Sequence, residues 1–280
     1  MSRVYRALEK VEEERKQRLE ESSLKVVEEK AILREGGAAL EFPEEEAEKL
    51  GLPTKEVTPV LIAPPHSFGA EAFRKLKTQI FLHPGKSPRT ILVTSTAPEE
   101  GKTLVAVNLA VAISKEIHSN VILIDGDLRR PGIHFAKSQG AKGLANYLSD
   151  GIPLSEILIN SEMEKLRLIL AGSPTRKSSE LLRSRKMGEL LQCLRESGDN
   201  TFIVIDSPPI MATADPTLLS TMVDGIILVI RAGYASRESI QSAIKTIDRQ
   251  KIIGVILNQM NTKPSSYFSQ YYRYYQYYRK

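Results

Sequence analysis

Short apolar runs rich in β-branched residues alternate with helical segments from about residue 68 onward. Six of these runs predict strands, at Thr90–Thr94, Val121–Asp125, Leu166–Ala171, Phe202–Asp206, Gly225–Ile230 and Ile252–Leu257. Helices are predicted around them, at Gly69–Leu82 and at residues 102–117, 178–197, 213–222 and 236–249. Because continuous apolar strands separated by helices are typical of a sheet covered on both faces, the pattern predicts an α/β fold with a mostly parallel sheet.

The two ends of the chain follow a different pattern. Residues 2–33 resemble a charged helix with one narrow apolar stripe, formed by Val4, Leu8 and Val11. A stripe this narrow does not build a core, so the helix is either solvated or docked on a partner. The sequence predicts three parts: an N-terminal charged helix with its linker at residues 1–66, a globular domain at 67–262 and a flexible tail at 263–280.

Composition adds several exclusions. Of 280 residues, 41 % are hydrophobic and 26 % are charged, which excludes wholesale disorder. The single cysteine, Cys193, excludes a disulfide framework and is expected to be buried in its helix. A net charge of +5 is too small to indicate nucleic acid, so no such partner is predicted. No apolar run approaches the roughly 18 residues that span a bilayer, and the N-terminus is too charged for a signal peptide, so a cytoplasmic protein is expected.

Tyrosine and charge are unevenly distributed along the chain. Residues 1–60 hold 11 Lys and Arg against 15 Asp and Glu, a net charge of −4. Seven of the 10 tyrosines lie in the last 14 residues, at Tyr267, Tyr271, Tyr272, Tyr274, Tyr275, Tyr277 and Tyr278. A sticky aromatic tail would explain this cluster, and so would a set of phosphorylation acceptors if the protein contains a site that transfers phosphate.

The first predicted strand leads into a loop that ends in Gly-Lys-Thr at the start of a helix. Strand, loop and helix are the parts of a P-loop, whose backbone N–H groups face phosphate oxygens. Lys102 would reach the β- and γ-phosphates, and the Thr103 hydroxyl would ligate Mg²⁺. The nucleotide-binding residues predicted from this loop are Ala97, Pro98, Glu99, Glu100, Gly101, Lys102, Thr103 and Leu104.

Three acidic residues stand where predicted strands end. Asp125 and Asp127 follow the second strand, and Asp206 ends the strand that begins at Phe202. Because the carboxyl ends of parallel strands meet at one edge of a sheet, these carboxylates are expected near the P-loop. Carboxylates at that position are usual Mg²⁺ ligands of P-loop enzymes, so the sequence predicts a Mg-nucleotide site.

Residues 91–131 and 202–209 resemble the Walker A, A′ and B motifs of the bacterial tyrosine kinases. These are P-loop enzymes that phosphorylate their own C-terminal tyrosine cluster. The A′ motif, three apolar residues and then Asp-x-Asp-x-Arg, is matched by Ile122–Ile124, Asp125, Asp127 and Arg129. The B motif, an apolar run and then Asp-x-Pro-Pro, is matched by Asp206, Pro208 and Pro209. The resemblance covers residues 67–262 and implies a P-loop NTPase fold.

Two further segments carry the resemblance. The Glu-x-x-Arg-x-x-Arg oligomerisation motif of the family is matched by Glu71, Arg74 and Lys77, where Lys77 replaces the last arginine. Residues 1–10 resemble the exosortase-associated (PEP-CTERM locus) tyrosine autokinases of exopolysaccharide gene clusters. The Min/Par-type ATPases share the fold, but they carry a signature lysine where this chain has Ala97.

The resemblance implies an ATP- and Mg²⁺-dependent protein-tyrosine autokinase that regulates exopolysaccharide biosynthesis or export. Its catalytic residues would be Lys102, Asp125, Asp127 and Asp206, with Asp125 as the base or orienting group for the tyrosine hydroxyl. Metal ligands would be Thr103, Asp127 and Asp206, and the seven tail tyrosines would be the acceptors. Asn258, at the end of the last strand, either contacts the adenine or is a simple polar strand-end residue.

Several partners follow from the same resemblance. It implies a ring-like homo-oligomer with phosphorylation between subunits, a separate membrane-bound chain-length-determinant activator and a phosphotyrosine phosphatase. The activator would recruit the cytoplasmic protein to the inner face of the membrane. Two alternatives are a Min/Par-type ATPase switch and a nucleotide-binding scaffold of the export complex.

Overall fold

The computed structural model describes residues 62–63, 67–83, 87–133, 140–161, 163–198 and 200–259. The helix predicted at residues 2–33 and the tyrosine tail therefore lie outside the described residues. Of the helices within them, none is long and apolar enough to cross a membrane.

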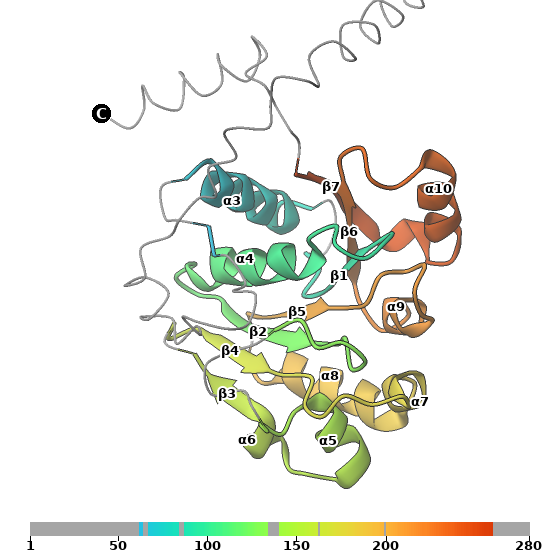
Figure 1. Ribbon diagram of the computed structural model, residues 1–280. Coiled ribbons are helices and arrows are strands. Elements are labelled where there is room, and N and C mark those ends of the chain that lie inside the picture. The colour runs from blue at the N-terminus through green and yellow to red at the C-terminus, as the bar shows by residue number, and fades with distance from the viewer. Residues whose placement is uncertain are drawn as a thin grey trace, which may run out of the picture. The chain divides into compact units, whose positions relative to one another are not determined.

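A seven-stranded sheet organises the described residues (Figure 1). Its strands are β1 (Thr90–Ser95), β2 (Asn120–Asp125), β3 (Leu158–Asn160), β4 (Leu166–Ile169), β5 (Thr201–Asp206), β6 (Gly225–Arg231) and β7 (Ile252–Asn258). They lie in the order β3-β4-β2-β5-β1-β6-β7, and every pair is parallel except β3 with β4. The predicted mostly parallel α/β fold is confirmed.

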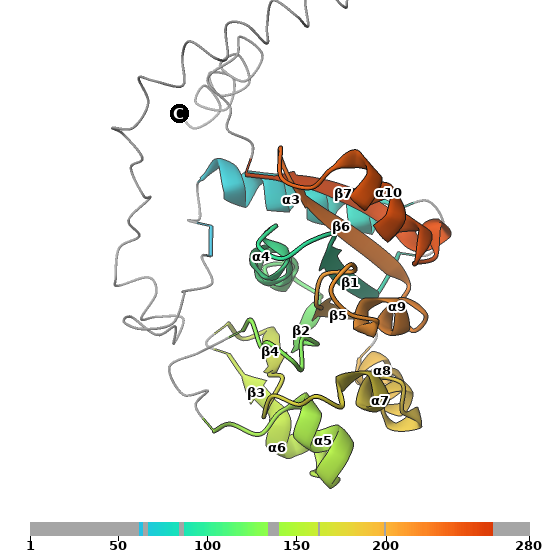
Figure 2. The ribbon, with the colours of Figure 1, turned by 45° about the vertical axis from the view of Figure 1, so that its right-hand side comes forward.

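Helices cover both faces of this sheet, as Figures 1 and 2 show. They are α3 (Phe68–Phe81), α4 (Lys102–Ser114), α5 (Leu144–Asp150), α6 (Leu154–Ile157), α7 (Ser178–Leu182), α8 (Arg185–Glu196), α9 (Asp215–Ser220) and α10 (Arg237–Lys245), with a 3₁₀ turn, η2, at Arg249–Lys251. One hydrophobic cluster joins α3 and α4 to one face, and a second joins α5 to α10 to the other. Because α3 packs against the outer side of α4, α4 is buried from Val105 to Ser114.

The structure differs from the sequence prediction in several elements. Strand β3 and the helices α5 and α6 were not predicted, since three- to seven-residue elements are too short to establish a period. The helix predicted at residues 178–197 is two helices. Ser184 separates them in an extended conformation, and its side chain caps α8 by accepting from the N–H of Met187.

Residues just before the predicted domain boundary contact the domain. The N–H of Ala63 donates to Oδ1 of Asn108 at 2.7 Å, and Ile62 packs against the cluster that contains α4. Asn108 in turn donates from Nδ2 to the carbonyl of Leu104 at 2.8 Å. The chain is therefore held to α4 two turns after the P-loop lysine, ahead of the boundary predicted at residue 67.

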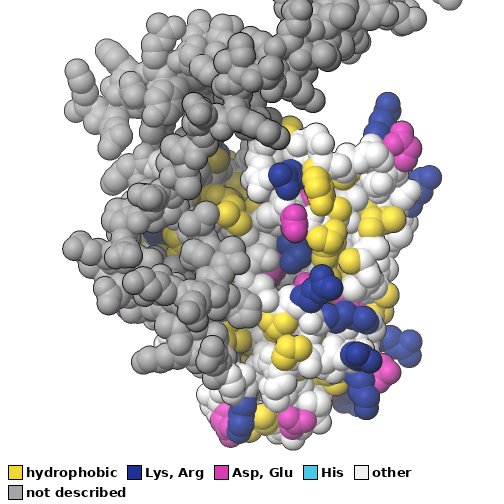
Figure 3. Space-filling model, in the orientation of Figure 1, with side chains coloured by type: hydrophobic (Ala, Val, Ile, Leu, Met, Phe, Trp, Pro, Cys, Tyr) yellow, Lys and Arg dark blue, Asp and Glu magenta, His cyan; other side chains and the backbone are white. Residues whose placement is uncertain are grey.

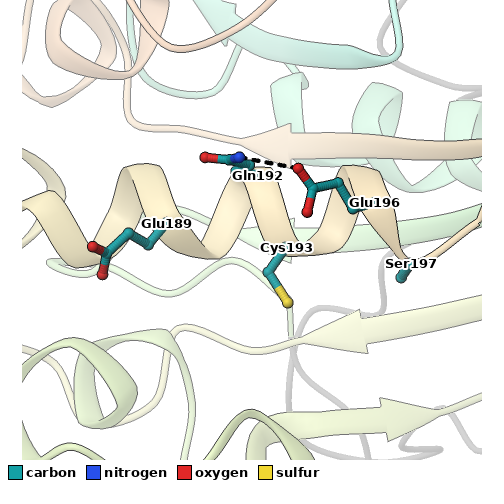
Figure 4. Close-up of a pocket in the computed structure, with 5 residues that line it drawn as sticks. All are labelled: Glu189, Gln192, Cys193, Glu196 and Ser197. Carbon is teal, nitrogen blue, oxygen red and sulfur yellow. Dashed lines mark hydrogen bonds between the residues drawn. The ribbon is translucent and has the colours of Figure 1, made fainter.

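Cys193 is exposed on the outer face of α8, so the prediction that it is buried is wrong. The buried stripe of α8 consists of Met187, Leu190, Leu191 and Leu194, and Cys193 lies outside it. Around the thiol is a shallow hollow of about 430 Å³, lined by Glu189, Gln192, Cys193, Glu196 and Ser197 (Figure 4). Gln192 and Glu196 there form a hydrogen bond of 3.0 Å along the helix.

Two glycines should respond in opposite ways to replacement by alanine. A Cβ at Gly143 would lie 2.3 Å from the carbonyl oxygen of Leu170 and 2.4 Å from the amide nitrogen of Gly172, both backbone atoms. We expect Gly143→Ala to lower the free energy of unfolding by about 2 kcal/mol or more. Gly188 in α8 has open space around it, so Gly188→Ala should raise that free energy by roughly 0.5 to 1 kcal/mol. Urea denaturation measures both, and a Gly143→Ala variant as stable as the wild type would contradict the expected clash.

Candidate nucleotide-binding site

The P-loop occupies the turn between β1 and α4, at the carboxyl edge of the central strands. Gly101, the N-cap of α4, has a φ of 92°, and a Cβ there would lie 2.1 Å from Nδ2 of Asn258. Only glycine combines this left-handed conformation with so close an approach. The chain therefore turns tightly into α4, and the first amides of the helix face the space before the loop.

The side chain of Glu100 fixes this loop through hydrogen bonds. Its side chain is fully buried, with Oε2 accepting from the N–H of Ala97 at 2.7 Å and Oε1 from the N–H of Arg231 at 3.2 Å. Nδ2 of Asn258 donates to the carbonyl of Glu100 at 2.9 Å. The side-chain amide of Asn258, for which adenine contact was one prediction, thus braces the P-loop against β7. The sequence predicts Glu100 only as a member of the P-loop; its hydrogen bonds to the N–H groups of Ala97 and Arg231 were not predicted.

The structure brings the predicted lysine, threonine and carboxylates together. Nζ of Lys102 lies 3.7 Å from Oδ2 of Asp127 and 3.9 Å from Oδ1 of Asp206. The Thr103 hydroxyl donates to Oδ2 of Asp206 at 2.6 Å. Lys102 and Thr103 come from the first turn of α4, whereas Asp127 and Asp206 follow β2 and end β5. The parallel neighbours β1, β5 and β2 thus assemble the site.

Asp125 accepts more backbone hydrogen bonds than the other two carboxylates. It has no exposed surface; Oδ1 accepts from the N–H of Asp127 at 3.0 Å, and Oδ2 accepts from those of Gly132 and Ile133 at 2.9 Å each. Burial, together with the nearby Asp206 carboxylate, raises the pKa of Asp125 to about 7. Both oxygens are therefore committed to holding the loop after β2, and Asp127 is the A′ carboxylate that faces Lys102.

Asp206 supplies a site that fits a divalent cation. Its Oδ1 is buried with no hydrogen-bond partner among the described residues, and burial raises the pKa of this carboxyl. A Cβ at Gly132 would lie 2.9 Å from Oγ1 of Thr103 and 3.4 Å from Oδ2 of Asp206, so glycine leaves the space beside these oxygens open. Hydroxyl and carboxylate oxygens suit Mg²⁺, and Thr103, Asp127 and Asp206 are the residues that would hold it.

Arg129, the last residue of the A′ motif, links three parts of the fold. Its Nε donates to Oγ of Ser178 at 2.7 Å and lies 3.4 Å from Oδ2 of Asp215, which is fully buried. The Ser179 hydroxyl donates to Oδ1 of the same aspartate at 2.5 Å. The turn after β2 is thereby tied to α7 and α9. The motif identified Arg129, but no spacing in the sequence indicated Ser178, Ser179 or Asp215 as its partners.

The residues of the oligomerisation motif lie along α3 and make contacts within the chain. Nε of Arg74 donates to Oε2 of Glu71 at 2.6 Å, and Lys77 pairs with Glu116 just beyond the end of α4. The first of these ion pairs lies within one turn of α3, and the second joins α3 to the segment that follows α4. The seven tail tyrosines, the predicted acceptors, lie outside the described residues.

The raised pKa of Asp125 predicts a pH dependence of stability in the absence of Mg²⁺ and nucleotide. The folded state retains this proton up to about pH 7, whereas the ordinary pKa is 3.8. The free energy of unfolding should therefore fall as the pH rises from about 4 to about 7, by roughly 1 kcal/mol per pH unit. We expect Asp125→Asn, which cannot titrate, to lose the part of this slope that Asp125 contributes, so that its deficit in stability relative to the wild type shrinks as the pH rises; Asp206, whose pKa burial also raises, would keep the remainder. Urea titrations across the range measure it, with the exposed Glu180→Gln as control; an unchanged slope in Asp125→Asn would contradict the assignment.

Comparisons with known proteins agree with this geometry. The family model described as AAA domain matches residues 89–259. Tyrosine-protein kinase YwqD of Bacillus subtilis (strain 168) is 31 % identical over 216 residues, which are 76 % of this chain and 90 % of that protein. The crystal structure of the chimerical protein CapA2B2 is 28 % identical, with a TM-score of 0.67, covering 79 % of this chain and 100 % of the other. The VpsO kinase domain is 32 % identical, with a TM-score of 0.62, covering 69 % and 95 %.

These similarities extend across the part of the chain that builds the site. The residues matched by the family model include the P-loop, both acidic strand ends and the last strand. The matches with YwqD and CapA2B2 cover 90 % and 100 % of those proteins. The mostly parallel P-loop fold is confirmed, and the structure places Asp127 and Asp206 within 4 Å of the P-loop lysine. The chain belongs to the bacterial tyrosine-protein kinases, a family of P-loop proteins.

Proposed function

We propose that this protein is an ATP-dependent tyrosine autokinase whose substrate is its own C-terminal tyrosine cluster. The position at which the tail leaves the domain carries the proposal. Asn258, the last residue of β7, is hydrogen-bonded to the carbonyl of Glu100 in the P-loop at 2.9 Å. The last described residues therefore lie beside the P-loop, and the segment with seven tyrosines follows them in the sequence.

The distances along the chain allow the tail to serve as substrate. Tyr267 is 8 residues beyond Gln259 and Tyr278 is 19 residues beyond it, so they can reach at most about 26 and 63 Å at 3.3 Å per residue. At these reaches the first tyrosines of the tail could enter the site of their own chain, and the last ones could enter that of a neighbouring subunit. The tail is therefore long enough for phosphorylation between the subunits of a ring, which the resemblance implies.

The residues on the nucleotide side have separable roles. Lys102 and the first amides of α4 would bind the β- and γ-phosphates of ATP and offset the charge that develops on the transferred group. Thr103, Asp127 and Asp206 would hold Mg²⁺, which neutralises phosphate charge when bound. Glu100 and Asn258 keep the loop amides in position, since their hydrogen bonds fix the backbone at residues 97–101.

The acceptor side is better assigned to Asp127 than to Asp125. Asp127 faces Lys102 with Oδ2, whereas both oxygens of Asp125 accept backbone N–H groups. A group that orients or deprotonates a tyrosine hydroxyl must come within hydrogen-bond distance of it. Asp125 would instead act as a positioning residue, because it holds the loop that carries Asp127.

The biological role and the partners are also part of the proposal. Relatives of this chain include the tyrosine-protein kinases YwqD and CpsD and a putative tyrosine-protein kinase in the cps region of Klebsiella pneumoniae. Together with the resemblance in the sequence, this supports regulation of exopolysaccharide biosynthesis or export. A ring built with α3, a separate membrane-bound activator that brings the protein to the inner face of the membrane, and a phosphotyrosine phosphatase would complete the system. Residues 1–66 would be accessory to the kinase domain at 67–262 and the tail at 263–280.

Phosphotyrosine detection after incubation with ATP and Mg²⁺ tests the kinase proposal. Wild-type protein should become labelled, and Lys102→Met should remain unlabelled because it lacks the phosphate-binding cation. A chain truncated after Asn261 should lose most of the label. A full-length chain with all seven tail tyrosines replaced by phenylalanine is the matched control for length. Label that survives Lys102→Met would exclude this kinase site, and label that persists in the phenylalanine chain would exclude the tail as main acceptor.

The division of roles between the two A′ aspartates predicts different phenotypes. Asp127→Asn should lower the rate of phosphoryl transfer by about 10²- to 10⁴-fold while the thermal midpoint stays near that of the wild type. Asp125→Asn should lower the midpoint, since its amide cannot replace a carboxylate that accepts three N–H groups. Thermal unfolding and initial rates at saturating ATP measure the two effects. An unstable Asp127→Asn with a stable Asp125→Asn would reverse the assignment.

A further inference from the structure

Two basic dipeptides, Arg129-Arg130 and Arg176-Lys177, lie side by side next to the site. The N–H of Thr175 donates to the carbonyl of Leu128 at 2.9 Å and holds their two segments together. All four side chains are exposed, and together they form what we call the basic surface. Figure 3 shows Lys and Arg side chains gathered over this part of the molecule.

The basic surface is built around a fixed guanidinium. Arg129 is held by Ser178 and by the buried Asp215, yet 42 % of its side chain remains exposed. Asp215 balances the charge of Arg129. Among the described residues, Arg130, Arg176 and Lys177 take part in no ion pair. The acidic residues next to them in the chain are Asp127, which lies 3.7 Å from Lys102, and the exposed Glu180 on α7. The surface therefore keeps an excess of positive charge.

Its position connects it to the transfer reaction. The N–H of Arg130 donates to Oδ1 of Asp127 at 2.9 Å, so the basic surface begins three residues from the carboxylate assigned to the acceptor side. An acceptor that has just been phosphorylated leaves the site carrying about −1.5 to −2 charges that were absent before. The guanidinium group of arginine and the ammonium group of lysine are the side-chain groups that bind such a phosphate.

We propose that the basic surface binds the phosphotyrosines of the C-terminal tail, the product of the reaction. This rests on the proposed autokinase function. The unmodified tail carries Lys263, Arg273, Arg279 and Lys280 and no acid, so the surface repels it. Three phosphotyrosines add about −4.5 to −6 and reverse the sign of the tail. The surface thus binds the phosphorylated product more tightly than the unmodified substrate. A multiply phosphorylated tail is retained beside the site, and its presence slows the transfer of further phosphate groups.

Fluorescence anisotropy with a synthetic peptide tests this site. The peptide covers residues 267–280 with phosphotyrosine at positions 272, 275 and 278, and the host is full-length Lys102→Met, which should not phosphorylate itself. We expect binding at least about tenfold tighter than for the unphosphorylated peptide, and a loss of about fivefold or more in a host that also carries Arg176→Ala and Lys177→Ala. The control host carries Lys245→Ala and Arg249→Ala, two exposed positions on α10 and η2, and should bind as before.

Several outcomes would overturn the proposal. Equal binding of both peptides, or equal binding by the Arg176→Ala, Lys177→Ala host, would do so. A peptide with glutamate at the three positions that binds as tightly would show that any acidic segment suffices, including the chain's own residues 41–48. Displacement of the phosphopeptide by ADP would place it in the P-loop. Loss of binding to phosphatidylglycerol vesicles in the double variant, without phosphopeptide binding, would assign the surface to a membrane. Because the peptide is phosphorylated chemically, the result does not depend on autokinase activity.

Discussion

Three carboxylates and one lysine meet at the carboxyl edge of the sheet, and the surrounding structure serves to hold that charge. Asp125 and Asp206 are fully buried, and Asp127 is nearly so. Nζ of Lys102 lies 3.7 Å from an oxygen of Asp127 and 3.9 Å from an oxygen of Asp206. Buried like charges are costly unless they are paired, hydrogen-bonded or protonated. All three conditions are met here. Three N–H groups donate to Asp125, and the Thr103 hydroxyl and Lys102 face Asp206. Burial raises the pKa of both Asp125 and Asp206, which favours their protonated forms. A bound divalent cation would complete the balance, since Oδ1 of Asp206 is left without a hydrogen bond.

Two hydrogen-bonded networks keep this charge in place from opposite sides. Glu100 and Asn258 connect the P-loop to the ends of β6 and β7, and Arg129 connects the loop after β2 to α7 and α9 through Asp215. The buried carboxylate of the first network, Glu100, accepts hydrogen bonds from loop N–H groups, and that of the second, Asp215, pairs with Arg129. Neither carboxylate is available to contact substrate. Displacement of either loop by a fraction of an ångström would change the distances between Lys102, Thr103 and the acids. Glu100 and Asp215, the carboxylates of the two networks, are fully buried, so the hydrogen bonds that hold the two loops are shielded from water.

Much of this could be predicted from the sequence, because the strands that build the site are continuous apolar runs that end in polar residues. Lys102, Thr103, Asp125, Asp127 and Asp206 were each identified by position at a strand or helix end, and parallel pairing brings such ends together. The roles of Glu100, Ser178 and Asp215 were not predictable, because their partners are remote in sequence and their types are common on surfaces. The division between Asp125 and Asp127 depends on which oxygens meet backbone N–H groups, and spacing alone does not specify this. The residue type alone predicts a buried Cys193, because cysteine is usually buried, whereas the phase of α8 places this side chain outside the apolar stripe.

The order of strands also bears on the proposed autokinase activity, in which the substrate would belong to the same chain as the enzyme. Strand β7 is the edge strand beyond β6, yet its last residue contacts the P-loop, because parallel strands end at the edge where the nucleotide site lies. Any segment that continues from β7 starts there, without a dedicated binding cleft. Such a tail has a high local concentration, so weak sequence-specific contacts suffice, and charge can decide when it stays. Under the proposal, an unmodified tail without acidic side chains would be repelled by the exposed arginines and lysine next to the site, and each transferred phosphate would reduce that repulsion. The reaction would thereby change the affinity of the site's surroundings for the tail with every turnover.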